Sequence, residues 1–128
     1  MPQPVILAID QGTSSSRAML FNAAGELLAQ AQQELSCSFP KSGWVEQDAE
    51  QIWLSVLAVC RDVLAQALAM QLHVVGIGIS NQRETTVLWH KQSGEVLAPA
   101  IVWQDRRTAD YCQQLQAHAV MLRQKTGL

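Results

Sequence analysis

Charged residues are scarce in this chain of 128 amino acids, and its lysines and arginines form no cluster. Nine basic and eleven acidic side chains make up 16% of the sequence and leave a net charge of −2. Surfaces that bind nucleic acid or anionic lipid need concentrated positive charge, so both partners are disfavoured, while neutral and anionic small molecules remain open. Hydrophobic residues account for 48%, which excludes intrinsic disorder. We expect one packed domain.

Long apolar runs, a signal peptide and paired cysteines are also lacking. The longest apolar runs, around residues 5–9 and 74–79, fall far short of the roughly 20 residues that a membrane span requires. The N-terminus has no basic stretch followed by an apolar stretch and a cleavage site, so we expect a cytoplasmic protein. The cysteines show no CxxC spacing, which predicts reduced, mostly buried thiols and neither disulfides nor a zinc site: Cys37, Cys60 and Cys112.

Two common nucleotide-binding motifs are absent as well. There is no GxxxxGK[ST] sequence, and residues 76–81 lack the third glycine of a dinucleotide fingerprint. The histidines have no ligand spacing, so we expect them to be solvated: His73, His90 and His118. Three carboxylates precede a predicted helix, and we expect them to serve its N-terminus and not a metal ion: Glu46, Asp48 and Glu50.

The first half of the chain predicts three strands and a helix. Residues 5–9 form a short apolar run before a turn, which predicts a central strand buried on both faces. Residues 17–21 and 26–33 flank a second turn and complete an antiparallel meander. Asp48 and Gln51 have capping-box spacing, so a helix is expected to begin there. Its apolar stripe extends over about five turns: Ile52, Val56, Val59, Val63, Ala67 and Met70.

The second half predicts further strands and a last helix. Residues 74–80 form a strand in which two glycines would let a helix or ligand approach closely, Gly76 and Gly78. Residues 85–89 and 95–97 predict a hairpin, and residues 100–102 another strand. Asp105 is expected to cap a helix with one apolar side: Tyr111, Cys112, Leu115 and Ala119. The chain is therefore predicted to be one α/β domain, and its apolar last residue indicates a truncated chain.

Three polar segments directly follow predicted strands, where ligands bind in sheets whose strands are joined by helices. If these strands are parallel, the segments are neighbours. The first segment, residues 10–17, offers a carboxylate for Mg²⁺, a glycine, several hydroxyls and a guanidinium, which together suit a phosphate group. A plain hairpin turn with polar residues is the alternative interpretation of this segment.

The other two segments suit a small polyol. The guanidinium of Arg83 donates to hydroxyl oxygens and the carboxylate of Glu84 accepts from hydroxyl hydrogens, a pairing that fits a diol. An exposed ion pair that opens a hairpin is the alternative. Trp103 begins the third segment, and its ring would either cover the carbon face of a substrate or pack in the core.

Four motifs taken together resemble the FGGY carbohydrate kinase family. They are IDQGTSSSR at 9–17, GWVEQD at 43–48, NQRET at 81–85 and IVWQDRRT at 101–108. The resemblance covers nearly the whole chain, and residues 81–85 are similar to the members that phosphorylate glycerol. It implies a ribonuclease-H-like α/β domain, as in actin, Hsp70 and hexokinase, with a mixed sheet and flanking helices. Residues 1–128 would be the N-terminal part of the first of two domains, incomplete at its C-terminus.

The resemblance also implies roles for individual residues. Asp10 would help to hold Mg²⁺ through water, and glycerol would contact Arg83, Glu84 and Trp103. The ATP phosphates would contact four further residues: Thr13, Ser14, Ser15 and Arg17. The implied reaction is ATP-dependent phosphorylation of glycerol to sn-glycerol 3-phosphate, in a cytoplasmic homo-oligomer. The family's general base and adenosine pocket lie beyond residue 128, so we expect no catalytic base here and no activity from this segment alone.

Departures from the family pattern are mild, and two alternative functions remain. Ser14 stands where threonine is common, and Ala49 where proline often starts the helix. A kinase of the same family acting on a pentulose or larger polyol would share Asp10 and Arg17 but use other substrate contacts. A non-catalytic module that kept the fold is the second alternative, and a large exposed apolar patch would count against it.

Overall fold

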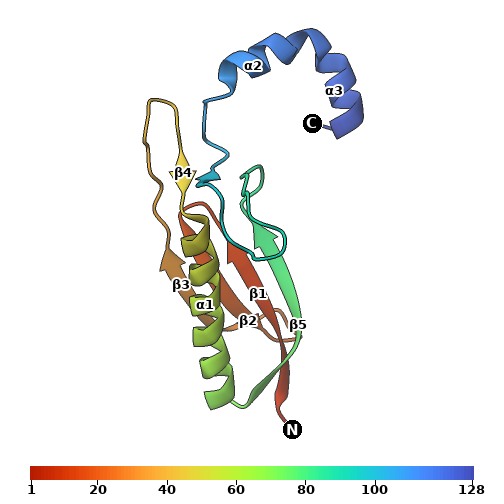
Figure 1. Cartoon of the computed structure of the whole chain (residues 1–128). Coiled ribbons are helices and arrows are strands. Elements are labelled where there is room, and N and C mark those ends of the chain that lie inside the picture. Colours follow the sequence, from red (N-terminus) through yellow and green to blue (C-terminus); the bar gives the residue numbers. More distant parts are fainter.

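A four-stranded mixed sheet with the strand order β3-β2-β1-β5 forms the base of the structure, a computed structural model that describes residues 1–128 (Figure 1). The strands are β1 (Gln3–Gln11), β2 (Ser15–Phe21), β3 (Leu27–Glu34) and β5 (Leu72–Asn81). The first three are antiparallel, and β5 lies parallel to β1. The predicted meander, the central position of the first strand and the α/β class are thus confirmed.

The helix α1 (Ala49–Ala69) begins where the sequence predicted and packs on the sheet. Asp48 caps it, because its Oδ1 accepts from the backbone N–H groups of Glu50 at 2.9 Å and Gln51 at 3.2 Å. The predicted stripe is buried at three of its positions: Val59, Val63 and Ala67. Met70 is an exception, because it follows the helix as its C-cap and is half-exposed.

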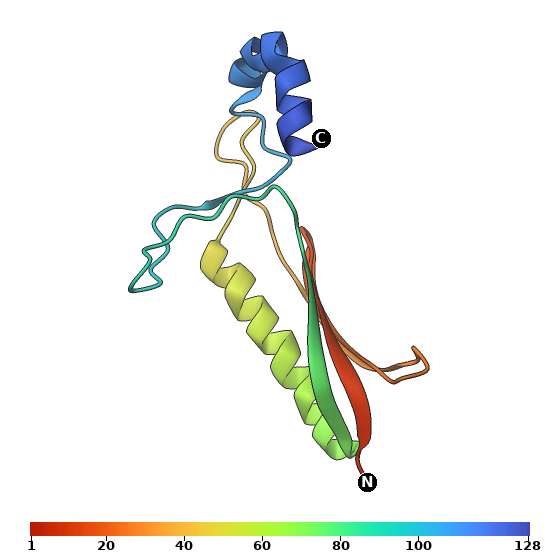
Figure 2. The same cartoon turned by 90° about the vertical axis from the view of Figure 1, so that its right-hand side faces the viewer.

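The core lies between α1 and one face of the sheet, as Figure 2 shows from the side. It consists of alternate strand residues and the stripe of α1: Val5, Leu7, Ala18, Leu20, Ala29, Ala31, Val59, Val63 and Ala67. The prediction that the first strand is buried on both faces was wrong. Ile6 points to the other face and is exposed, because α1 covers one side only.

The length and apolar composition of α1 would suffice to cross a membrane. In this fold, however, α1 is a core helix. Its buried stripe faces the sheet, a buried hydroxyl pair joins Ser55 to Ser16 of β2 at 2.7 Å, and Arg61 and Asp62 lie near its middle. The pattern therefore belongs to a helix that packs on a sheet.

The predicted close approach of a helix or ligand at the glycines of β5 is not observed. A Cβ at Gly76 would lie 3.1 Å from Cδ1 of Ile6, a side chain of the adjacent strand, and Gly78 faces open space. No helix covers this part of β5, and three apolar residues are exposed along it: Val75, Ile77 and Ile79.

The predicted strand at 100–102 does not join the main sheet. It forms β6 (Ala100–Ile101), which pairs antiparallel with β4 (Glu46–Gln47) in a separate two-stranded sheet. The predicted hairpin before it is reduced to a single bridge between Trp89 and Val96, with a tight turn at Gly94.

The predicted last helix is interrupted and differently capped. The chain forms α2 (Ala109–Gln114), the 3₁₀ turn η1 (Leu115–His118) and α3 (Ala119–Thr126), which extend away from the sheet (Figure 1). Asp105 does not cap α2; the N-cap is Thr108, without a side-chain bond. None of these helices has a buried residue, so the expected packed apolar side is absent.

The prediction of mostly buried thiols was also wrong. Cys37 and Cys60 are half-buried, Cys112 is exposed, and all are free. Burial raises the pKa of the Cys60 thiol above its ordinary value, which keeps it protonated and unreactive.

Candidate functional site

The parallel pairing of β1 and β5 brings two of the predicted polar segments together. Asp10 lies opposite Ser80 and Gln11 opposite Asn81 in the strand register, so both strands end at the same edge. A cavity of about 300 Å³ opens there, and its lining includes Asp10, Thr13, Asn81, Arg83, Glu84 and Trp103. The expectation that the three segments are neighbours is confirmed.

The turn after β1 is tight, and glycine suits it because a side chain would crowd the backbone. The backbone N–H of Gly12 donates to the carbonyl oxygen of Ser15 at 2.8 Å. A Cβ at Gly12 would approach that same oxygen to 3.1 Å, closer than side chains normally come. The turn leaves the carboxylate of Asp10 exposed at the end of β1, on the rim of the cavity.

Trp103 reaches the site by a route that the sequence did not indicate. It follows β6 of the small sheet, and Val102 between them is buried with its N–H bonded to the carbonyl of Val45 at 3.0 Å. The indole Nε1 of Trp103 donates to Oγ1 of Thr13 at 2.8 Å. The ring is 53% exposed, so the interpretation of Trp103 as a core residue is wrong. Its ring is instead available beside the cavity.

Arg83 and Glu84 both line the cavity, and they do not pair with each other. Both ion pairs of the chain involve Arg107, so the alternative of an exposed ion pair at 83–84 is wrong. Glu84 has a φ of 57°, in the left-handed region that glutamate rarely adopts. Such backbone strain is concentrated at functional sites, and here it occurs at the residue whose carboxylate is expected to bind a polyol.

The remaining predicted phosphate contacts lie beside the cavity and not in its lining. Ser14 is exposed in the turn, and Oγ of Ser15 accepts from Nε2 of Gln32 at 2.9 Å. Arg17 lies opposite Asp10 in the β1–β2 register, and its guanidinium donates to Oε1 of Gln32 at 3.0 Å. Gln32 of β3 therefore orients both side chains, a role that the sequence did not reveal.

Comparisons with known proteins decide the family. Residues 5–128 match the N-terminal domain of the FGGY family of carbohydrate kinases. The chain belongs to this family. As an FGGY kinase chain it is 55% identical over 125 residues to glycerol kinase 1 of Pseudomonas aeruginosa. It is 58% identical over 125 residues to the glycerol kinase of Herminiimonas arsenicoxydans.

These two alignments cover 96% of the chain but 25% of each relative, so the chain spans about a quarter of their length. Among solved structures, Plasmodium falciparum glycerol kinase with ADP superposes with a TM-score of 0.81 at 28% identity, over 91% of this chain and 23% of that one. Xylulose kinase from Rhodospirillum rubrum gives 0.79 at 28% identity, over 89% and 23%. The predicted resemblance and fold class are confirmed.

The sequence patterns did not predict one group of interacting side chains in the FGGY chain, although its members lie in two of the four motifs. The guanidinium of Arg107 stacks on the ring of Trp44 at 3.8 Å and lies 2.8 Å from carboxylate oxygens of both Glu46 and Asp105. Asp105 also accepts from the N–H of Val45 at 2.7 Å. This group joins the segment after Trp103 to β4, and it explains why Asp105 is not a helix cap.

The electrostatics of this group follow from the contacts. Arg107 holds the pKa of the Asp105 carboxyl well below its usual range, chiefly through their side-chain hydrogen bond. Asp105 and Glu46 in turn raise the pKa of Arg107. Asp105 and Arg107 are therefore both charged at neutral pH, and the pairing of aromatic and charged residues in the two motifs is the sequence signal for the group.

Proposed function

We propose that the protein containing this chain phosphorylates glycerol with ATP, yielding sn-glycerol 3-phosphate, and that residues 1–128 are the N-terminal part of its first kinase domain. The observation that carries the proposal is the cavity at the ends of β1 and β5, which is lined both by the turn expected to bind phosphate and by Arg83 and Glu84, expected to bind a polyol. The similarity to glycerol kinases supports the choice of substrate.

The polyol site consists of Arg83, Glu84 and Trp103. The guanidinium donates to glycerol oxygens and the carboxylate accepts from glycerol hydroxyls, so each charged group meets the polarity it needs. The Trp103 ring covers the carbon face, and its bond to Oγ1 of Thr13 at 2.8 Å fixes the ring's orientation. Binding in this way would hold one hydroxyl in line for transfer.

The nucleotide phosphates bind at the turn between β1 and β2. Backbone N–H groups and the hydroxyls of Thr13, Ser14 and Ser15 donate to phosphate oxygens, and Arg17 adds a positive charge held by Gln32. These groups stabilise charge on the transferring phosphoryl group.

Asp10 suits a water-mediated contact with Mg²⁺. In phosphoryl-transfer sites this ion keeps several waters and is held by one or two carboxylates together with phosphate oxygens. Asp10 is exposed at the rim of the cavity, and the chain has no group of three ligating side chains that would make a protein cage. The bound ion would neutralise negative charge on the phosphates.

The chain supplies binding groups but no general base. We propose that the base and the adenosine pocket come from sequence beyond residue 128, so the 128-residue segment alone is inactive. A cytoplasmic location and homo-oligomeric assembly remain predictions for the complete protein.

A pentulose kinase is the second candidate, because the xylulose kinase from Rhodospirillum rubrum superposes almost as well as the Plasmodium glycerol kinase. The stand-alone module is disfavoured. Ile77 and Ile79 of β5 are exposed by 63% and 74%, and a self-sufficient domain rarely leaves such adjacent apolar side chains uncovered.

ADP release by the complete polypeptide tests the proposal. Glycerol, a pentulose, a hexose and dihydroxyacetone would be compared at equal concentrations with saturating ATP and Mg²⁺. We expect the highest kcat/KM with glycerol. A preference for a sugar would contradict the substrate assignment and leave the phosphate turn in place, whereas no release with any substrate would favour the non-catalytic module.

A further inference from the structure

The buried side chain of Gln47 connects the two halves of the candidate site. Gln47 belongs to β4, directly before α1, and is 2% exposed. Its Nε2 donates to the backbone carbonyl of Thr13 at 2.6 Å, and its Oε1 accepts from Nε2 of Gln82 at 2.8 Å. One amide thus bonds both to the segment after β1 and to the segment after β5.

Further hydrogen bonds extend this connection beyond Gln82 and beyond Thr13. Oε1 of Gln82 accepts from the hydroxyl of Thr85 at 3.2 Å, and Oγ1 of Thr13 accepts from the indole of Trp103 at 2.8 Å. A continuous series of hydrogen bonds therefore runs from Thr85 through Gln82, Gln47 and Thr13 to Trp103. It includes a residue from each of the three polar segments that were predicted from the sequence.

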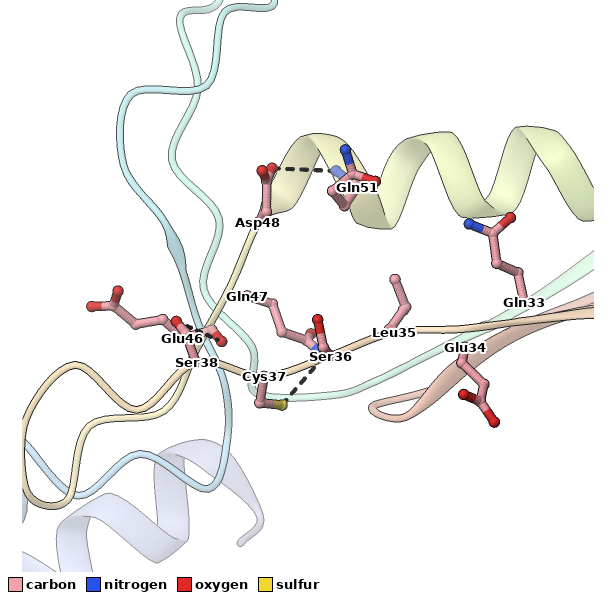
Figure 3. A pocket seen from close by; sticks show the side chains of 10 residues that line it. All are labelled: Gln33, Glu34, Leu35, Ser36, Cys37, Ser38, Glu46, Gln47, Asp48 and Gln51. Carbon is pink, nitrogen blue, oxygen red and sulfur yellow. Dashed lines mark hydrogen bonds between the residues drawn. The ribbon is translucent and has the colours of Figure 1, made fainter.

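The amide of Gln47 has one possible orientation. A carbonyl oxygen only accepts, so Thr13 requires the NH₂ group of Gln47 on its side, and the oxygen is left for Gln82. Nε2 also lies 3.5 Å from Sγ of Cys37 in an adjoining pocket, where Figure 3 shows Gln47 between Cys37 and the start of α1. Every buried side-chain polar atom has a partner, so neither the nitrogen nor the oxygen of this amide is left unpaired.

We propose that Gln47 is a positioning residue: it holds the nucleotide-binding turn and the polyol-binding segment at a fixed separation, so that each ligand favours binding of the other. The inference rests on the proposed function. Gln47 does not line the cavity itself, and it acts through Thr13 and Gln82. Ordering one segment orders the other through the amide, and such coupling is reciprocal between the two ligands.

The test uses Gln47→Met in the complete polypeptide, because methionine has similar length and volume but donates no hydrogen bond. Calorimetry would give the Kd of a non-hydrolysable ATP analogue with and without saturating glycerol. We expect glycerol to tighten nucleotide binding in the wild type. The coupling factor is the nucleotide Kd without glycerol divided by the Kd with glycerol. Loss of the bonded amide should reduce this factor by about 3- to 10-fold.

A matched control and a second variant make the result specific. Gln66→Met is the matched control. It removes the same kind of bond, which Nε2 of Gln66 donates to the carbonyl of Gln30 at 3.3 Å near the other end of α1. This variant should leave the coupling unchanged. Gln82→Met breaks the next bond in the series and should reduce the coupling as Gln47→Met does. The double variant should lose no more than either single variant.

Several outcomes would overturn the inference: a wild type without coupling, unchanged coupling in the folded variants, or equal loss in Gln66→Met. If Gln47→Met does not fold, Gln82→Met decides the question alone. Failure of the proposed function is distinguishable, because the wild type would then fail to phosphorylate glycerol or would prefer a sugar. An active wild type whose variants keep full coupling would refute the positioning role only.

Discussion

Replacing Arg83 with alanine separates ligand binding from folding at this site. Arg83 is exposed and takes part in neither ion pair of the chain, so its removal breaks no such internal contact. Exposed substitutions of this kind change stability by less than about 0.5 kcal/mol. Any large effect on kinetics therefore comes from the lost contact with substrate.

The size of the effect follows from the chemistry of the contact. One hydrogen bond from a charged donor contributes about 1.5 to 3 kcal/mol, which corresponds to an increase of about 10- to 150-fold in the glycerol KM. The ATP KM should change by less than about twofold, because the phosphates are assigned to the turn after β1 and not to Arg83. An increase in the glycerol KM without a similar increase in the ATP KM is the result that would assign Arg83 to the polyol.

Initial rates of ADP release by the complete polypeptide would be measured with glycerol varied at saturating ATP, and then the reverse. Arg61→Ala is the matched control, since Arg61 is an exposed arginine on α1, away from the cavity. It should leave both KM values unchanged. Equal increases of both KM values in Arg83→Ala, or a clear fall in its Tm, would refute the assignment of Arg83 to the polyol.

Three further predictions concern strain, buried hydroxyls and pH, each measured on the complete polypeptide. Gln71 and Glu84 both have a left-handed φ, so Gln71→Gly and Glu84→Gly should each raise the free energy of unfolding by about 1 kcal/mol. Only Glu84→Gly should raise the glycerol KM, and an unchanged KM would contradict a role for its carboxylate. Ser55→Ala leaves the hydroxyl of Ser16 buried without its partner at 2.7 Å, which should cost about 1 to 3 kcal/mol in urea unfolding. The double alanine variant should recover part of that loss, and no recovery would contradict the pairing. The folded-state pKa of the Asp105 carboxyl lies below its ordinary value of 3.8. The carboxylate therefore stabilises the fold fully above about pH 3.8, and this contribution is lost as the pH falls below that value towards the folded-state pKa. The Tm difference between wild type and Asp105→Asn should thus be constant from pH 5 to 7 and shrink below about pH 4, and a difference that grows on acidification would contradict it.

Local patterns predicted the elements whose determinants lie close together in sequence. The alternation in β1 to β3, the Asp48 cap and the α1 stripe all depend on neighbours within a few positions. The sequence left open whether β1 and β5 are parallel; their observed parallel pairing meets that condition and places Asp10 beside the segment of Arg83.

Contacts between distant residues were not predictable in this way. Asp105 has the spacing of a helix cap, but the N–H of Val45, 60 positions earlier, and the Arg107 guanidinium use its carboxylate instead. Trp103 was expected at the edge of the main sheet, whereas it reaches Thr13 from the small sheet. A pattern of polarity cannot specify such partners, because many carboxylates and hydroxyls would satisfy it equally well.

The most direct test of the central claim is a crystal structure of the complete polypeptide with glycerol and a non-hydrolysable ATP analogue. We expect glycerol oxygens within hydrogen-bond distance of Arg83 and Glu84, with its carbons against the Trp103 ring. The phosphates should lie at the turn that holds Thr13. Glycerol bound elsewhere, for example in the pocket beside Cys37, would contradict the claim that the ends of β1 and β5 form the kinase site.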